Sequence, residues 1–461
     1  MWAEESVMYQ IYPLGMCGAP FENDGIPAHR ILKVLDWIDH LRKLHVNVVY
    51  FGPVFESDTH GYNTRDYKKI DTRLGTNEDF KAVCDALHAA GIRVYLDGVF
   101  NHAGRGFTQF QDVLKNREGS AYKDWFYINF GGNDAFNDGL WYEGWEGNYD
   151  LVKLNLDNPA VCDHLIDAVN YWIDYFGIDG LRLDVAYMVN RNFLKRLRSF
   201  TDAKKKDFYL IGEILGGDYR QIMNDEMCHS VTNYECYKGM YSSFNSLNMF
   251  EIEYSLNRQF GQDPWCLYTG KHLMNFVDNH DVNRIASTLT CKEHLKLIYA
   301  MLFGIPGIPC VYYGSEFGAQ GRKEDEGHDL ALRAAFDKPQ WNELTDYIAA
   351  LAKAKRESEA LNYGSYRKVL LTNRQIIFER KSGHERVLVA INADAADYTA
   401  HFDAGCGQAV DLITGKPHDF GGGSLLPAYS ASYWKMERCC RTATAELLWT
   451  RLAGAPRPGT D

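Results

Sequence analysis

The sequence contains no run of roughly eighteen uncharged apolar residues, and the segment from Met1 to Ser6 is neither basic nor apolar. From these absences we expect that the sequence contains neither a transmembrane helix nor a secretory signal. The 11 cysteines show no metal-ligand spacing, and an odd number of thiols cannot all pair within one chain. We therefore expect a cytoplasmic protein with reduced cysteines.

The chain also lacks the excess of basic residues that favours binding to phosphate groups. It has 61 acidic and 49 basic residues, a net charge of -12, which repels nucleic acids and anionic membranes. We expect neither as a partner, and we expect a small, neutral ligand instead. The aromatic content of 14% fits this, since aromatic rings stack on the apolar face of a sugar, although most of these residues could equally be core.

Short β-rich runs alternate with helical patterns over most of the 461 residues, which predicts an α/β protein with a parallel sheet. Ile31, Val34, Leu35, Ile38 and Leu41 recur at helical spacing, as do Phe80, Val83 and Leu87. Eight strands predict a closed (β/α)₈ TIM barrel. They are expected at 7–12, 46–51, 93–100, 180–184, 208–213, 230–233, 273–278 and 308–313.

Two stretches depart from this alternation. Residues 103–155 are rich in Gly, Asn, Trp and Tyr, which predicts an ordered lid subdomain inserted after the third strand. Residues 361–437 contain short alternating strands separated by glycine turns, which predict a C-terminal antiparallel β-sandwich. The barrel is then formed by residues 1–102 and 156–360, and residues 438–461 form a tail that could be poorly ordered.

Four short motifs stand where predicted barrel strands end. They are DGVFNH at 97–102, GLRLD at 180–184, GE at 212–213 and VDNHD at 277–281. A parallel barrel gathers the carboxyl ends of its strands at one rim, where TIM barrels carry out their chemistry. We therefore expect Asp184, Glu213 and Asp281 to share one cleft. Paired carboxylates of this kind can cleave a glycosidic bond, one as acid and one as nucleophile.

The four motifs, in this order, resemble those of the α-amylase family, glycoside hydrolase family 13, over about residues 5 to 435. HGYNTRDY at 60–67 and GIPGIP at 304–309 resemble two further connections of that family. NHAG at 101–104, YKDWF at 122–126 and LN at 154–155 are most similar to the neopullulanase, cyclomaltodextrinase and maltogenic amylase group. The resemblance implies a retaining hydrolase of α-1,4 bonds in maltodextrins, cyclodextrins or pullulan. A transglycosylase or α-1,6-glucosidase of the same family is the alternative, and a non-catalytic carbohydrate-binding or interaction barrel is a more distant one.

The resemblance also implies roles for the three carboxylates. Asp184 corresponds to the nucleophile, Glu213 to the general acid, and Asp281 to the third carboxylate, which binds sugar hydroxyls. Each carboxylate also has a purely structural alternative. Glu213 could be a surface glutamate, Asp184 could form an internal ion pair with Arg182, and Asp281 could be a helix N-cap. No organic cofactor is implied.

Sugar-binding roles are implied for three further residues. His102 and His280 resemble the histidines that hydrogen-bond the sugar being cleaved, and Tyr62 resembles the aromatic platform beneath it. Arg182 lies two residues before Asp184 on the same strand, so both side chains point to one face and the cation favours the ionised carboxylate.

Three polar residues complete the predicted site. Asp97 is expected in the same polar network, and Arg284 could either pair with a site carboxylate or stabilise its loop. Asn101 matches a calcium ligand of many α-amylases, or it hydrogen-bonds the lid backbone. Both alternatives stay open for Arg284 and Asn101.

The sequence departs from the family pattern on the acceptor side. Tyr187-Met188 replaces a Lys-His pair, and Leu215 stands where an aromatic is common. The barrel begins almost at Met1, where that group carries a dimer-forming domain, so the resemblance predicts no oligomeric state.

Overall fold

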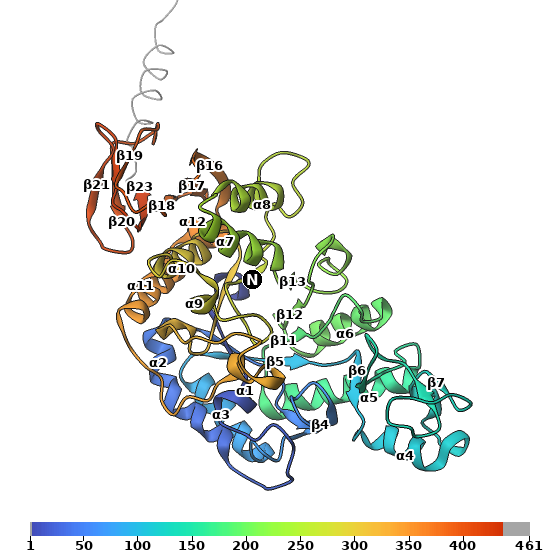
Figure 1. Cartoon of the computed structure of the whole chain (residues 1–461). Helices are drawn as coiled ribbons and strands as arrows, with labels where there is room; N and C mark the ends of the chain where they lie inside the picture. Colours follow the sequence, from blue (N-terminus) through green and yellow to red (C-terminus); the bar gives the residue numbers. More distant parts are fainter. Residues whose placement is uncertain (1, 437–461) are drawn as a thin grey trace, which may run out of the picture.

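The computed structural model describes residues 2–436, so the predicted tail at 438–461 lies outside the described residues. A central barrel carries a small subdomain on one side and a β-domain on another (Figure 1). Within residues 2–436, no helix combines the length and the apolar character needed to cross a bilayer.

All eight predicted barrel strands are present and pair in parallel, in the order β13-β12-β11-β5-β2-β1-β15-β14. A parallel bridge between Thr232 and Met274 joins the two ends of this order and closes the barrel. The strands are β1 (Met8–Ile11), β2 (Val48–Phe51), β5 (Arg93–Gly98), β11 (Gly180–Leu183), β12 (Tyr209–Gly212), β13 (Ser230–Val231), β14 (Met274–Phe276) and β15 (Ile308–Tyr312).

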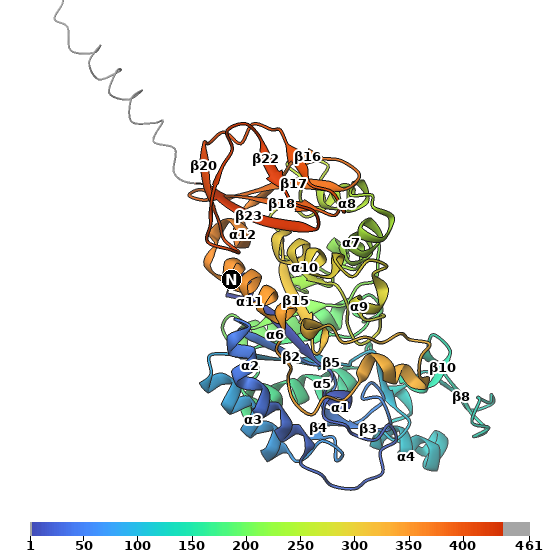
Figure 2. The same ribbon diagram turned by 60° about the vertical axis from the view of Figure 1, so that its left-hand side comes forward.

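Helices cover the outside of the barrel (Figure 2). They are α2 (Ile38–Lys43), α3 (Asn77–Ala89), α5 (Pro159–Tyr171), α6 (Arg191–Lys204), α7 (Tyr234–Ser246), α8 (Phe250–Phe260), α10 (His294–Gly304), α11 (Glu343–Glu357) and α12 (Glu359–Tyr363), with one-turn helices α1 (Pro13–Met16) and α9 (Ile285–Thr288). Thr76 and Asp79 form a capping box that fixes the start of α3, and the predicted apolar face of that helix is buried. Of the other predicted set, Ile31, Val34 and Leu41 are buried, whereas Ile38 is partly buried and Leu35 is exposed.

The inside of the barrel is filled by large side chains rather than open. A separate buried cluster inside the barrel packs side chains from β1, β2, β5, β12, β14 and β15 against one another. It consists of Ala3, Met8, Val48, Tyr50, Tyr95, Tyr209, Ile211, Met274, Phe276, Ile308 and Cys310. This cluster closes the barrel beneath the rim that carries the predicted site.

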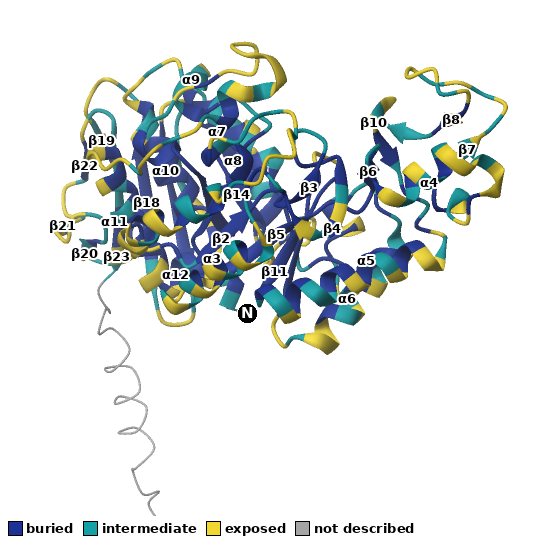
Figure 3. Ribbon diagram, turned by 90° about the horizontal axis from the view of Figure 1, so that it is seen from below, coloured by how far each residue is buried: buried dark blue, intermediate teal, exposed yellow. Residues whose placement is uncertain are grey.

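The insertion after β5 forms the small subdomain seen beside the barrel in Figure 3. Its main sheet contains β6 (His102–Gly104), β10 (Asn148–Lys153) and β9 (Gly144–Trp145). The helix α4 (Thr108–Asn116) and the pair β7 (Ile128–Asn129) and β8 (Trp141–Tyr142) complete it. On the barrel, a hairpin of β3 (Phe55–Ser57) and β4 (Thr64–Ile70) borders β6. These contacts join the subdomain to the rim of the barrel.

The C-terminal domain is an antiparallel β-sandwich, as predicted. Its larger sheet has the order β16-β17-β18-β23-β20-β21, and a second sheet pairs β19 with β22. The strands are β16 (Ser365–Leu371), β17 (Gln375–Lys381), β18 (Arg386–Asn392), β19 (Tyr398–Ala400), β20 (Gln408–Asp411), β21 (Pro417–Asp419), β22 (Ser424–Leu426) and β23 (Ser430–Met436). Arg380 and Tyr433 hydrogen-bond the carbonyls of Gly304 and Ala300, which ties this domain to α10.

Candidate active site

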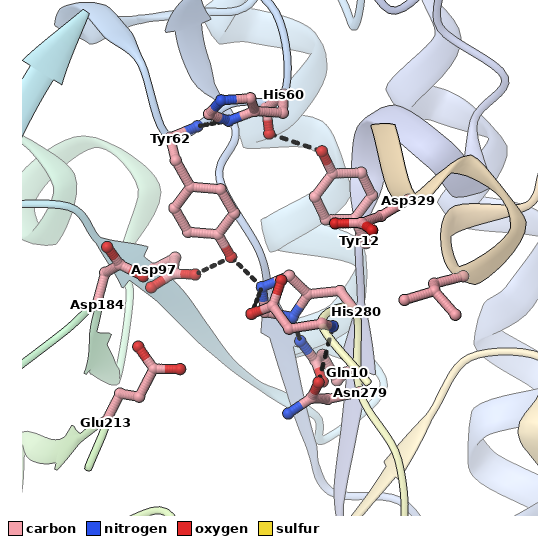
Figure 4. A network of polar contacts seen from close by, with 12 residues as sticks. Gln10, Tyr12, His60, Tyr62, Asp97, Asp184, Glu213, Asn279, His280 and Asp329 are labelled. Carbon is pink, nitrogen blue, oxygen red and sulfur yellow. Dashed lines mark hydrogen bonds and ion pairs between the residues drawn. The ribbon is translucent and has the colours of Figure 1, made fainter. Parts of the chain in front are cut away.

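A cavity of about 500 Å³ opens at the carboxyl-terminal rim of the barrel. Asp184, Glu213 and Asp281 all line it, although they follow three different strands. Figure 4 shows Asp184 and Glu213 side by side. Glu213 is buried at the site and is not a surface glutamate. The structure therefore brings the three predicted carboxylates together in one cleft.

The pairing of β11 with β12 sets Asp184 beside Glu213. Leu183 is in register with Gly212, so the next residue on each strand carries a carboxylate. The backbone N–H of Glu213 donates to the Leu183 carbonyl at 2.9 Å, which continues this ladder. Adjacent strands lie about 4.8 Å apart, so the register alone holds the two carboxylates near each other.

Arg182 connects the carboxylates from below the cavity. Its guanidinium lies 2.9 Å from Asp184, 2.5 Å from Glu213 and 2.9 Å from Asp97. Asp97 also accepts hydrogen bonds from the hydroxyls of Tyr50 and Tyr62. Neither Arg182 nor Asp97 lines the cavity, so both act on it through these contacts.

Burial is the main influence on the pKa values of Asp184 and Glu213, and it raises both. The Arg182 guanidinium opposes this rise, whereas the neighbouring carboxylates add to it. The backbone N–H of Val185 also donates to Glu213 at 2.9 Å. Two carboxyl groups this close titrate as a unit, and such a pair can hold one proton near neutral pH.

Asp281 has a different electrostatic environment. Burial would raise its pKa, but the His280 imidazole at 3.0 Å and the Arg333 guanidinium at 3.1 Å hold that pKa well below its usual range. The helix-cap alternative does not apply to Asp281, because Asp278 accepts the hydrogen bond from the first N–H of α9, that of Ile285. Asp281 thus stays ionised and faces the cavity.

The predicted sugar-binding aromatics lie on one side of the cavity. Tyr62 lines it, and the Tyr62 ring stacks on His280 at 5.5 Å between centroids. The His280 ring is fixed by Gln10, Tyr62 and Asp281 and lies behind the cavity wall. His102 lines the cavity 3.9 Å from Asp184, and burial lowers the pKa of His102 to about 3, so its imidazole is neutral.

Arg284 does not reach the cavity, which corrects its predicted placement among the sugar-binding residues. Its buried guanidinium donates to the carbonyls of Tyr313 and Leu332 and to the Ser315 hydroxyl. The chain from His280 to Arg284 is not helical, so the four-residue spacing does not bring the two side chains to one face. The alternative of a loop-stabilising arginine fits these contacts.

Asn101 lies at the junction of barrel and lid. Its carbonyl accepts from the backbone N–H of Leu154 at 3.0 Å, and its side-chain amide contacts His102 Nδ1 at 3.2 Å. Within residues 2–436, no group of three or more His, Cys, Asp or Glu side chains is arranged to hold a metal ion. These surroundings do not fit the oxygen cage that calcium requires, and the calcium site stays a prediction.

Several cavity residues have no counterpart in the predicted set. Arg333 belongs to the connection after β15 and reaches back to Asp281, and Trp145 comes from the lid. Tyr187 and Leu215, which mark departures from the family pattern, also line the cavity. The Trp-rich composition of the lid could have indicated that Trp145 lines the cavity. Nothing in the sequence around Arg333 indicates that this residue does so.

Comparison with known proteins agrees with this geometry. The catalytic-domain model of the alpha-amylase family matches residues 31–360. A cyclomaltodextrinase from a Bacillus species is 32% identical over 425 residues, which is 86% of this chain and 74% of that protein. The intracellular maltogenic amylase of Bacillus subtilis is also 32% identical, over 70% of this chain and 57% of its own length. A solved structure of the cyclic alpha-maltosyl-(1→6)-maltose hydrolase from Arthrobacter globiformis superposes with a TM-score of 0.80 at 29% identity, covering 95% of this chain and all of that one.

Proposed function

The chain belongs to the α-amylase family of glycosidases, and on that basis we propose that it hydrolyses α-1,4-glucosidic bonds in short linear or cyclic maltodextrins with retention of the anomeric configuration. The observation that carries the proposal is that Asp184 and Glu213 both contact one arginine, Arg182, beneath the cavity. Retaining glycosidases hold their two carboxyl groups about 5 Å apart. Contact of both carboxylates with the one Arg182 guanidinium, on adjacent strands in register, is compatible with such a spacing.

In the proposed reaction, Glu213 protonates the glycosidic oxygen while the Asp184 carboxylate attacks the anomeric carbon. The bond to the leaving sugar breaks, and a covalent glycosyl-enzyme forms. Glu213, now ionised, takes a proton from water, which attacks the same carbon and releases Asp184. Arg182 is a positioning residue, because it touches both carboxylates from below and stabilises whichever is charged.

The remaining side chains hold the sugar during these steps. Ionised Asp281 accepts hydrogen bonds from sugar hydroxyls, and neutral His102 contributes a ring nitrogen, Nε2, that has no hydrogen-bond partner among residues 2–436. Tyr62 supports the ring from one side. No organic cofactor enters the proposed reaction, because the two carboxylates supply both the proton and the nucleophile.

The relatives support the substrate class and the location. One is named a cyclomaltodextrinase and another an intracellular maltogenic amylase. We propose that this chain likewise acts on small α-glucans, and in the cytoplasm. The net charge of -12 is compatible with a neutral substrate of this kind.

Following the anomers by proton NMR during digestion of maltoheptaose tests this proposal. We expect the α-anomer to appear first and Asp184→Asn to lower kcat by at least about 10³-fold, since a nucleophile cannot be replaced by a peripheral contact. Asp163→Asn, on the exposed face of α5, is the matched control and should keep full activity. First appearance of the β-anomer, or near-normal turnover by Asp184→Asn, would contradict the proposed roles. Digestion of pullulan and cyclodextrin in parallel distinguishes hydrolysis from transglycosylation and α-1,6 cleavage.

A further inference from the structure

Two aromatic rings form a bridge over one end of the active-site cavity. Phe21, from the connection between β1 and β2, stacks on His328, from the connection after β15, with 4.1 Å between ring centroids and 24° between planes. Both residues line the cavity. β1 is the neighbour of both β2 and β15 in the barrel, so the Phe21–His328 bridge joins two adjacent loops across the rim.

The Phe21 side of the bridge is firmly anchored. Arg73 is fully buried, and its guanidinium donates to the carbonyls of Pro20 at 3.0 Å and Phe21 at 2.5 Å. Arg73 is itself held by two hydrogen bonds to Asp71 at 2.8 and 2.7 Å. A buried ion pair therefore fixes the backbone that presents the Phe21 ring.

The His328 side stands on a strained turn. His328 and Asp329 have φ angles of 59° and 61°, a left-handed conformation that is uncommon for residues other than glycine. Asp329 lies 3.7 Å from Lys323 and 3.8 Å from Arg333, and Arg333 contacts Asp281. Such strain persists where surrounding contacts impose it, and here those contacts lead to a site carboxylate.

The bridge lies at the end of the cavity away from the proposed acid. Glu213 accepts hydrogen bonds from the Val185 N–H and the Tyr234 hydroxyl. In the proposed reaction Glu213 protonates the leaving sugar, so that sugar lies at this end of the cavity. At the other end, the Arg333 guanidinium lies over Tyr12, whose hydroxyl bonds the His60 carbonyl. Figure 4 shows His60 and Asp329 on the side opposite Glu213. Sugar units on the non-reducing side of the cleaved bond therefore extend toward the bridge.

We propose that the Phe21–His328 bridge caps this end of the cavity and limits the number of glucosyl units that fit before the cleaved bond. A linear maltodextrin is then cut at a fixed, short distance from its non-reducing end. This inference rests on the proposed α-glucan hydrolase activity, and it adds the residues that determine product length.

The test is product analysis on maltoheptaose labelled at its reducing end. The wild type should release one short unlabelled product throughout the early reaction. Phe21→Ala and His328→Gly should each raise the ratio of longer to shorter unlabelled products by about tenfold, a typical result of enlarging a binding pocket. His328→Gly relieves the left-handed strain, so this variant should fold at least as well as the wild type.

Phe250→Ala removes an exposed aromatic from α8 and is the matched control, with an expected product ratio equal to that of the wild type. Active variants that keep the wild-type product ratio would overturn the role of the bridge while leaving the hydrolase activity intact. A wild type that cuts no α-glucan would instead overturn the proposed function, and the bridge proposal with it.

Discussion

Arg182 contacts three carboxylates, each on or directly after a different barrel strand: Asp97 in β5, Asp184 after β11 and Glu213 after β12. One cation cannot neutralise three buried anions, so the group as a whole favours the uptake of a proton. That proton is what an acid catalyst needs. Arg182 thus both limits the repulsion that would disrupt the site and leaves enough of it to keep one carboxyl protonated.

Asp278 gives a pH-dependent prediction at the same scale. Burial raises its pKa to about 6 despite the Arg284 charge, so the folded state binds this proton more tightly than the unfolded chain does. Its contribution to stability is complete below about pH 4 and is lost as the pH rises through about 6. Between pH 4 and 7, the free energy of unfolding of the wild type should therefore fall relative to that of Asp278→Asn by up to about 3 kcal/mol.

Urea unfolding of both proteins across this pH range measures the difference. The contributions of the other titratable groups are the same in the two proteins and cancel in this difference. The Asn side chain can still accept from Ile285, so the variant retains the hydrogen bond that starts α9. A difference that does not change with pH would show that Asp278 titrates normally in the folded protein.

Single residues also mark the limit of what the sequence predicts. Asp184 and Glu213 could be placed because each directly follows a strand whose neighbours were recognisable. Arg284 could not be placed from the sequence, because the direction of its side chain depends on a non-helical turn. Arg333 lies 52 positions beyond Asp281, and only the folded connection after β15 brings the two together.

At the scale of elements, the spacing of β11 and β12 sets the geometry of the site. Gly180 begins β11, and a Cβ at this position would lie 2.5 Å from the Tyr209 carbonyl and 2.4 Å from the Tyr95 ring. The close approach of the two strands therefore requires glycine. The strands and their order could be predicted from the sequence, but the distance between β11 and β12 could not.

Gly180→Ala should push β12 away from β11, lowering the free energy of unfolding by about 1–3 kcal/mol through overpacking. Because Asp184 and Glu213 follow these two strands, we also expect kcat on maltoheptaose to fall by up to about 100-fold. Chemical unfolding and initial rates measure the two effects. Gly383→Ala, where no atom lies within 4 Å of the new Cβ, is the control. Unchanged stability and rate in Gly180→Ala would mean that the strands can separate without consequence.

At the scale of the whole molecule, the C-terminal sandwich is attached to the helix that precedes β15. Arg380 is fully buried and donates to the carbonyls of Gly304 and Gly364. Burial lowers the pKa of Arg380 to about 9, so the contact places a costly cation at the junction. The sequence predicted the sandwich from its alternating strands, whereas this contact depends on the docking of the two domains.

Arg380→Met keeps much of the side-chain volume and leaves both carbonyls without a donor. We expect it to lower the melting temperature and to reduce the free energy of unfolding by about 2–4 kcal/mol, with separate calorimetric transitions for barrel and sandwich. Arg374→Met is the control, because Arg374 pairs with Asp394 at the surface, where ion pairs contribute little. A single transition at the wild-type temperature would show that the junction does not couple the domains.

The packed barrel interior restricts the route by which sugars and water enter and leave the cavity. Because Tyr50, Tyr209 and their neighbours fill the interior, nothing can pass through the barrel, and sugars and water share the rim side of the cavity. With the proposed bridge across one end, the leaving sugar has to clear the entrance before water can reach the proposed glycosyl-enzyme. In the proposed reaction the products therefore leave in a set order, and the glucan fragment attached to Asp184 leaves last.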